Sequence, residues 1–472
     1  MLLASRLFEN KFYYYLFTFI IITNLLIQYV IILAASDNSI YFLIGYNLLL
    51  ILILFYKEHV QNLAAFLLIV NFLPLLYLNN DWHYNIKYEL LTAFPLALLL
   101  LLSIFHFLLT SRDLSFKITY LQKPIILLVL YFSIIAIVSL LNNYDTLWVL
   151  NQFFHFLLYL LIFPIYYLFN KRKYYHTVLG VLFLISLIIA FEYMLFNQLL
   201  FNYRFVTFQS GFLPLVSGII FAYIILSKNL VHKIIATIFL IIISAGAFVT
   251  LTRTLWVTTI LVLFFTWILY LKSKNKLSVQ KIMLYLILIS LSLYMVRDMG
   301  GSARQKVTPG ESVQYRTQSV ANPLADNSFL MRVELSYYAF QRFLENPLFG
   351  KGFGDYVKFK FTAVSNEAIY YIDNSWFYFL WKGGIIGLLL FLWLFARFFK
   401  TAYFVFNNSE DLRTKYLCLG ILGGFLGIAF LGLLSPLLIK YKSNALIVFI
   451  FAYVEFERYK IESSIKSEKP II

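Results

Sequence analysis

The sequence predicts an all-α polytopic membrane protein. Of its 472 residues, 62% are hydrophobic and only 13% are charged, and the mean hydropathy is +0.82. A water-soluble domain is closer to half apolar and a quarter charged. Apolar runs that could cross about 30 Å of hydrocarbon as helices recur from end to end. The alternating strands of a membrane barrel, about ten residues each, do not occur.

About fourteen membrane helices are expected, with one long polar interval before the last three. The first apolar run is longer than the roughly 7–15 residues of a secretory signal peptide, although Ala34-Ala35-Ser36 resembles a cleavage site. It is therefore predicted to be an uncleaved helix. The predicted helices lie near 12–34, 40–56, 62–78, 88–110, 124–141, 147–168, 178–198, 211–227, 233–250, 253–271, 281–297, 376–396, 414–434 and 444–457.

The distribution of lysine and arginine predicts the orientation in the membrane. With the N-terminus inside, the inner segments hold 23 of these residues and the short outer loops hold 5. Because basic residues favour the cytoplasmic side, both termini are expected in the cytoplasm and the polar interval outside. The predicted parts are a transmembrane bundle (1–296), an extracytoplasmic catalytic loop (297–375), C-terminal transmembrane helices (376–457) and a cytoplasmic tail (458–472).

The net charge of +16 does not indicate nucleic-acid binding, because the basic residues are scattered between membrane segments and follow the topology. The single cysteine, Cys418, lies in an apolar run. A disulfide and a cysteine-based metal site are therefore excluded, and Cys418 is interpreted as a small buried residue.

The long loop changes composition twice. Residues 300–328 are rich in polar residues, glycine and proline, and a loosely ordered lid is expected there. Residues 329–345 have a helical period and end before Asn346-Pro347. This helix is expected to rest its apolar face on the bundle or the bilayer and to present its arginines to an outer cavity. The apolar positions are Leu330, Val333, Tyr337, Phe340 and Leu344.

Three arginines are candidate ligands for an anionic substrate. An enzyme at the outer surface has no ATP, so its substrates must arrive activated, and lipid-linked phosphates or pyrophosphates are expected. A guanidinium binds phosphate oxygens through two parallel hydrogen bonds and stays charged. Arg253, at a predicted membrane boundary, and Arg332 are candidates to stabilise a pyrophosphate leaving group, and Arg342 to bind substrate. The alternatives are an interface anchor for Arg253 and a solvated helix face for Arg342.

Four carboxylates of the loop are candidate general bases: Glu334, Glu345, Asp355 and Asp373. Asp373 is preferred because it immediately precedes the re-entry helix, where it can face both the loop and a membrane cavity. Glu334, Glu345 and Asn374 are expected to contact substrate, although Glu345 could simply pair locally. The loop contains no histidine or cysteine, so no zinc site is expected, and no cofactor is required. Magnesium between carboxylates remains an alternative.

The run Gly350-Lys351-Gly352-Phe353-Gly354 is neither a dinucleotide-binding fingerprint nor a phosphate-binding P-loop, because it follows a helix and a proline instead of a strand. Two interpretations remain open. The glycines can form a tight turn that needs positive φ, or their backbone amides can cradle a phosphate or a sugar.

Together these motifs resemble the O-antigen ligase and polymerase superfamily. The resemblance covers residues from about 240 to 395 and rests on Thr252-Arg253-Thr254, the Arg332 helix, the 345–354 turn, Asp373-Asn374-Ser375-Trp376 and Gly383-Gly384-Ile385-Ile386-Gly387. It implies a fold similar to C-type glycosyltransferases and a metal-independent, inverting transfer of sugar chains from undecaprenyl pyrophosphate. It also implies that Arg253 and Arg332 hold the donor pyrophosphate at the outer face of the bacterial cytoplasmic membrane.

The chain departs from the ligase pattern at two places. An aspartate, Asp373, stands where ligases have a histidine, and threonines flank Arg253. The departure favours a polymerase of lipid-linked repeat units for O-antigen, capsule or exopolysaccharide over ligation to a lipid core. Membrane lipids, a flippase and a chain-length regulator are the expected partners. The rival hypothesis is a lipid-linked sugar transporter, which predicts charged residues along a path through the helices and inverted repeats.

Overall fold

The computed structural model describes residues 120–163, 165–166, 186–187, 190, 212–249, 253–274, 327–359 and 367–467. The first four predicted helices and the one near 281–297 lie outside these ranges, as does most of the one near 178–198. The lid predicted at 300–328 also lies outside them, except for its last two residues, which begin α14. Nearly all the described residues belong to one compact unit, made of Phe116–Ile162 and Lys173–Ile472. All the site residues predicted from the sequence lie in this unit.

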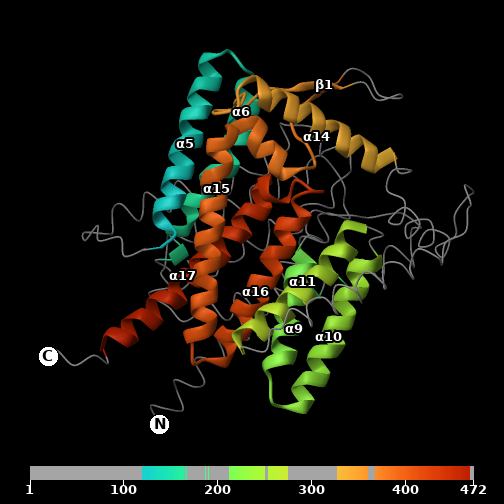
Figure 1. The fold of residues 1–472 in the computed structure, drawn as a ribbon, viewed down its shortest axis with the longest axis vertical. Helices are drawn as coiled ribbons and strands as arrows, with labels where there is room; N and C mark the ends of the chain where they lie inside the picture. Colours follow the sequence, from blue (N-terminus) through green and yellow to red (C-terminus); the bar gives the residue numbers. More distant parts are fainter. Residues whose placement is uncertain are drawn as a thin grey trace, which may run out of the picture. The chain divides into compact units, whose positions relative to one another are not determined.

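The unit is mostly helical, as predicted (Figure 1). Five of its described helices are long and apolar enough to cross a membrane, within α5, α10, α11, α15 and α16. The prediction of a helical membrane protein is confirmed to that extent, while the number fourteen stays a prediction. The helices are α5 (Gln122–Leu141), α6 (Thr146–Leu157), η2 (Leu158–Leu161), α9 (Leu213–Leu226), α10 (Leu230–Val249), α11 (Arg253–Ser273), α14 (Asn327–Glu345), α15 (Ser375–Asn408), α16 (Leu412–Leu431), η6 (Leu437–Ile439) and α17 (Tyr441–Ser467).

Helix α16 packs closely against α9 and α11 through glycines. A Cβ atom on Gly420 would meet the backbone of α9, and one on Gly423 or Gly427 would meet Thr266 or Thr258 of α11. Small residues allow such close approach in membranes, where no hydrophobic force draws helices together. Because Gly427 meets the start of α11 and Gly423 meets a later turn, the two helices are antiparallel. Helix α11 therefore begins at the end of the unit where α16 finishes.

Helix α15 is longer than predicted and is broken near its start. It runs from Ser375 to Asn408, whereas the sequence predicted its end near residue 396. The residues predicted to form an inner loop continue the helix, because Phe398, Ala402 and Val405 are buried at helical spacing. The break lies at Gly384, whose φ of 62° and ψ of −167° are not helical.

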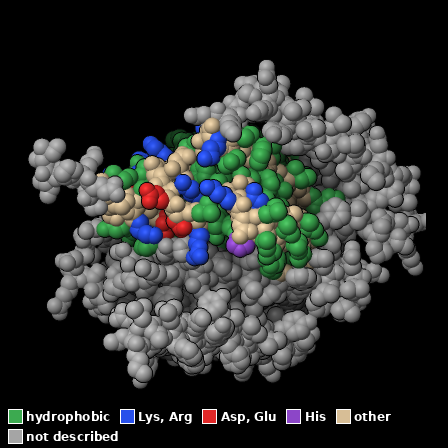
Figure 2. All heavy atoms as spheres, turned by 90° about the horizontal axis from the view of Figure 1, so that it is seen from below, with side chains coloured by type: hydrophobic (Ala, Val, Ile, Leu, Met, Phe, Trp, Pro, Cys, Tyr) green, Lys and Arg blue, Asp and Glu red, His purple; other side chains and the backbone are tan. Residues whose placement is uncertain are grey.

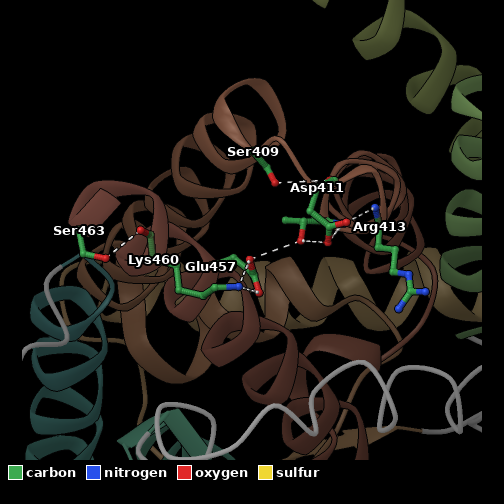
Figure 3. Close-up of polar contacts among 7 residues, drawn as sticks. Ser409, Asp411, Arg413, Glu457, Lys460 and Ser463 are labelled. Atoms are coloured by element: carbon green, nitrogen blue, oxygen red, sulfur yellow. Dashed lines mark hydrogen bonds and ion pairs between the residues drawn. The ribbon is translucent and has the colours of Figure 1, made fainter. Parts of the chain in front are cut away.

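Helix α17 also continues beyond its predicted end at 457, so the predicted tail begins as a helix. Polar contacts stabilise these last turns (Figure 3). Glu457 is buried and accepts hydrogen bonds from Lys460 at 3.3 Å and from Thr414 of α16 at 3.4 Å. Arg458 donates to Glu462, one helical turn further on, at 2.8 Å. Such pairs three or four residues apart support a helix that periodic apolar residues alone would not predict.

Basic side chains gather at the end of the unit that holds the α9–α10 turn, shown in Figure 2. The exposed or half-exposed residues there come from the ends of α9, α10, α11, α16 and α17. They are Lys228, Lys233, Lys272, Lys274, Arg413, Lys415 and Lys460. This clustering agrees with the charge distribution that predicts a cytoplasmic side.

Helix α14 lies where the sequence predicted a helix. Its apolar stripe, expected to rest on the bundle or the bilayer, is exposed, from 36% at Phe340 to 58% at Tyr337, so the stripe does not rest on the bundle and its contact with the bilayer stays a prediction. The face packed against α15 contains Leu335 and Ala339, both buried, with Arg332 and Arg342 at its edges. The small Ala339 allows the closest approach to α15, and the expectation that the arginines face an outer cavity stays a prediction.

A short antiparallel hairpin, which the sequence did not predict, follows the glycine-rich turn. Strand β1 (Val357–Phe359) pairs with β2 (Glu367–Ile369), and Val357 lies opposite Ile369. Strands of three residues are too short to show a two-residue period, which explains why an all-α fold was predicted.

Candidate functional site

An ion pair joins α14 to the segment before α15. The Nε atom of Arg332 lies 2.6 Å from Oδ2 of Asp373, and the two side chains are 34% and 43% exposed. These residues are far apart in sequence, and both were predicted site residues. Among the described residues, no acceptor lies on the two terminal nitrogens of Arg332 and no donor on Oδ1 of Asp373. The pair can therefore present both a guanidinium fork and a carboxylate oxygen to a bound substrate.

Asp373 is held in place by the residues that follow it. Oδ1 of Asn374 caps α15 by accepting from the backbone N–H groups of Trp376 at 3.0 Å and Phe377 at 3.1 Å. The N–H of Ser375 donates to the carbonyl of Gly432, just after α16, at 2.7 Å. Because these bonds fix residues 374 and 375, the carboxylate next to them has little freedom to drift. The predicted contact of Asn374 with substrate stays a prediction.

A second charged cluster surrounds Arg342. Its Nη1 atom lies 3.2 Å from Glu345, its Nε atom lies 3.7 Å from Asp355, and Nη2 donates to the carbonyl of Tyr356 at 3.4 Å. Lys351 pairs with Glu345 at 2.5 Å. Arg342 therefore ties α14 to the glycine-rich turn. The Arg342 side chain remains 36% exposed while it makes these contacts, and the local pairing considered for Glu345 occurs.

Acid is expected to weaken this cluster. The hydrogen bond from Lys351, helped by the charge of Arg342, lowers the pKa of Glu345 below its ordinary value of 4.5. A carboxyl group with a lowered folded-state pKa stabilises the fold above its unfolded-state pKa, and this contribution disappears as pH falls through the folded value. The thermal stability difference between wild type and Glu345→Gln, measured from pH 7 to pH 3, should shrink below a pH of about 4.5. It should amount to no more than about 1 kcal/mol, because the pair is half exposed. A difference that stays constant to pH 3 would contradict this role.

The glycine-rich turn fits into the break in α15. Its carbonyls at Pro347 and Leu348 accept from the N–H groups of Ile385 at 2.9 Å and Ile386 at 3.4 Å. In return, Lys351 donates its backbone N–H to the carbonyl of Trp381 at 2.8 Å. The turn therefore satisfies backbone groups that the broken helix cannot pair internally, as membrane burial requires.

All three glycines of the turn have positive φ: 73° at Gly350, 87° at Gly352 and 77° at Gly354. Their N–H groups all donate within the protein, to Asn346, Lys382 and Gln152 respectively. The N–H groups of Lys351 and Phe353 are engaged as well. These contacts favour the tight turn over the amide cradle, because they leave none of the five amides for a phosphate.

A buried lysine, which was not among the residues predicted from the sequence, anchors the turn. Lys382 of α15 is 0% exposed; its Nζ atom donates to the carbonyl of Asp355 and lies 3.6 Å from the centre of the Trp381 ring. The indole of Trp381 donates to Oδ2 of Asp355 at 2.7 Å. Asp355 therefore has a structural part, whereas the sequence presented it as a candidate base. A lone lysine within an apolar run is itself a signal of such a role.

Residues 238–392 match the O-antigen ligase family model. The resemblance inferred from the motifs is thereby confirmed for this stretch, which begins within α10 and ends within α15. Members of this family are membrane enzymes of the glycosyltransferase type. The comparison with curated proteins found no match for the chain.

The matched residues, 238–392, contain every predicted site residue, and the structure places them unequally. In the structure, Arg332 forms an ion pair with Asp373, and Arg342 forms one with Glu345. Glu334 is exposed on α14 and has no partner among the described residues.

The first residue of α11 is Arg253, whose side chain lies outside the described atoms. Its backbone lies at the end of the unit where α16 finishes, which is also the end where Ser375 binds Gly432. The fold thus places Arg253 and Asp373 at the same end of the bundle. Whether their side chains share a cleft stays a prediction. In the ranges that the structure describes, no three His, Cys, Asp or Glu side chains are grouped to hold a metal ion.

Proposed function

We propose that this protein is a polymerase that joins undecaprenyl-pyrophosphate-linked oligosaccharide units at the outer face of the bacterial cytoplasmic membrane. The observation that carries the proposal is the half-exposed pair of Arg332 and Asp373, in which one nitrogen holds the carboxylate and the two others have no partner among the described residues. The match to the O-antigen ligase family supports a lipid-linked sugar as the donor.

The roles follow from the atoms of the pair. The terminal nitrogens of Arg332 bind the donor diphosphate, with Arg253 as a second ligand from the start of α11. Oδ1 of Asp373 accepts the proton of the acceptor hydroxyl, whose oxygen attacks the anomeric carbon of the donor sugar. The bond between that carbon and the diphosphate oxygen breaks, and undecaprenyl pyrophosphate leaves with both bonding electrons. The guanidinium stabilises the negative charge that develops on the leaving group.

Arg332 can act on both substrates because its Nε atom holds the Asp373 carboxylate while its terminal nitrogens face the donor. One guanidinium joins the carboxylate on one side to the diphosphate on the other, so acceptor and leaving group approach a common centre. Glu334, Arg342, Asn374 and the glycine-rich turn would act around this centre: Glu334 at the open edge, and the others by holding the loop in place. A flippase that delivers the donor and a chain-length regulator are the partners that such a reaction requires.

The basic end of the unit supports the proposed orientation. It lies opposite the end that bears α14, to which Asp373 is paired, so a cytoplasmic location for the basic end leaves the site outside (Figures 1 and 2). Both termini are accordingly proposed to lie in the cytoplasm.

Reconstitution tests the function directly. Purified protein in liposomes, given the lipid-linked repeat unit extracted from host cells that lack the gene, is expected to make a ladder of longer glycans, and EDTA should not stop it. A lipid A-core acceptor tests the ligase alternative: transfer of single, preformed chains to that core, without a ladder, would replace the polymerase assignment. Movement of the unit across the bilayer without any new glycosidic bond would favour a transporter.

A further inference from the structure

A cluster of aromatic side chains lies on α6 and on the hairpin that leads to Asp373. The rings of Trp148 and Tyr370 are stacked, with centroids 4.0 Å apart and planes inclined by 9°. The ring of Tyr356 lies 5.5 Å from that of Tyr370. All three side chains are only partly buried. Together, Trp148, Tyr356 and Tyr370 form an aromatic platform.

The hairpin explains why two of these rings lie together. Val357 pairs with Ile369, so Tyr356 and Tyr370 form the next position across the two strands. Opposite residues of an antiparallel pair project from the same face, and Lys358 lies on that face two residues after Tyr356. Lys358 is exposed, whereas Val357, on the other face, is buried. The platform therefore belongs to the open face of the hairpin.

The polar groups at the edges of the platform have no partner in the described part of the chain. Among the residues that the structure describes, no partner lies on the indole N–H of Trp148 or on the hydroxyls of Tyr356 and Tyr370. Burial raises the pKa of Tyr370 above its ordinary value of 10, so its phenol stays a protonated hydrogen-bond donor at neutral pH.

The platform is fixed close to the proposed reaction centre. Gln152 of α6 is fully buried; its Nε2 donates to the carbonyl of Tyr370 at 3.0 Å and its Oε1 accepts from the N–H of Gly354 at 2.9 Å. Tyr370 precedes Asp373 by three residues, which can span at most about 11 Å. A ligand on the platform would therefore lie within a few sugar lengths of the Asp373 carboxylate.

We propose that the aromatic platform is a sugar-binding subsite that holds the acceptor glycan next to Asp373. A sugar ring has flat C–H faces and a rim of hydroxyls. Rigid Trp and Tyr rings can cover such a face while their N–H and O–H groups bind the rim. The charges beside the platform, Lys358 and the Asp145 carboxylate that caps α6, are opposite in sign, which suits a sugar better than a bare anion. The acceptor role rests on the proposed polymerase function, whereas sugar binding itself does not.

Two measurements with one oligosaccharide test the subsite. The lipid-linked unit extracted from host cells that lack the gene serves as the substrate for transfer, and the same oligosaccharide freed of lipid by mild acid serves as the binding probe. Trp148→Ala is expected to raise the acceptor concentration for half-maximal transfer about tenfold, with kcat nearly unchanged, as for the loss of one stacked ring. Trp148→Phe, which keeps a ring, should restore most of that affinity. The matched control is Tyr337→Ala, which removes an exposed aromatic ring from α14.

The binding probe gives a readout that does not require activity. It should change tryptophan fluorescence in the wild type and in Tyr337→Ala, and the part due to Trp148 should be missing in Trp148→Phe. Tyr356→Ala replaces Trp148→Ala if the latter does not fold, as judged by size-exclusion chromatography. The subsite proposal would be overturned if transfer kinetics and fluorescence were the same in the wild type and in the platform variants. That result would not contradict the proposed polymerase function. A fluorescence change from Trp148 in a protein that transfers no glycan would support sugar binding and refute the proposed polymerase function.

Discussion

Arg332→Ala is expected to lower kcat/KM for glycan transfer about a thousandfold while the protein stays folded. The variant loses the fork that holds the departing diphosphate, and it also releases Asp373 from the 2.6 Å bond that orients it. Arg332→Lys keeps the charge but offers no planar fork, so its activity should remain at least about tenfold below that of the wild type. The measurement is initial-rate transfer in liposomes with the lipid-linked unit at several concentrations.

Two comparisons make this result specific. Arg413→Ala removes an exposed arginine at the opposite, basic end and should transfer at the wild-type rate. Asp373→Asn should lower the rate by about 10²-fold or more and remove the acidic limb of the pH–rate profile, because an amide cannot accept the proton. An Asp373→Asn enzyme with an unchanged pH profile would limit Asp373 to positioning Arg332. Full activity in Arg332→Ala would refute the proposed mechanism.

Gly384→Ala is expected to prevent stable folding, with a loss of about 3 kcal/mol or more. The backbone of Gly384 has a conformation that other residues rarely adopt. In addition, a Cβ atom there would lie 2.5 Å from the carbonyl carbon of Leu348 and 2.6 Å from the nitrogen of Gly350. Both are backbone atoms of the inserted turn, so neither can move without removing the turn from the helix break.

The matched control is Gly387→Ala, three residues later in the same helix. Its Cβ would contact the rings of Phe132 at 3.1 Å and Tyr131 at 3.2 Å, which are side chains that can shift. Thermal unfolding in detergent and the yield of monodisperse protein should therefore fall sharply for Gly384→Ala and little for Gly387→Ala. Similar melting temperatures for Gly384→Ala and the wild type would show that the break in α15 does not depend on this glycine.

Much of the site could be anticipated because its residue types are costly or unusual in an apolar chain. Arg332 drew attention as a guanidinium on the predicted loop helix and Asp373 as a carboxylate just before a predicted membrane helix, and the period and the Asn346-Pro347 stop located α14. Their pairing could not be predicted, because nothing local relates two residues on either side of a turn and a hairpin. Lys382 was overlooked because its partners, the Asp355 carbonyl and the Trp381 ring, are brought to it only by the folded turn.

The orientation of α14 shows a different limit. A three- to four-residue period indicates that one face of a helix meets an apolar environment, and in a membrane protein both protein and lipid provide one. The sequence therefore could not tell whether the stripe from Leu330 to Leu344 or the face with Ala339 packs against protein. The position of the neighbouring helix decides this.

The sequence alone determined the class of this protein, a helical membrane protein, and the region that carries its charged motifs. Hydrophobicity and charge are properties of individual residues, so the amino-acid sequence is enough to predict membrane helices and their orientation. The tertiary structure alone decided that the glycine-rich turn repairs the break at Gly384, that Arg332 meets Asp373, and that Trp148 meets Tyr370. Each of these joins segments distant in sequence, and backbone groups freed in one segment find their partners only when another is folded against it.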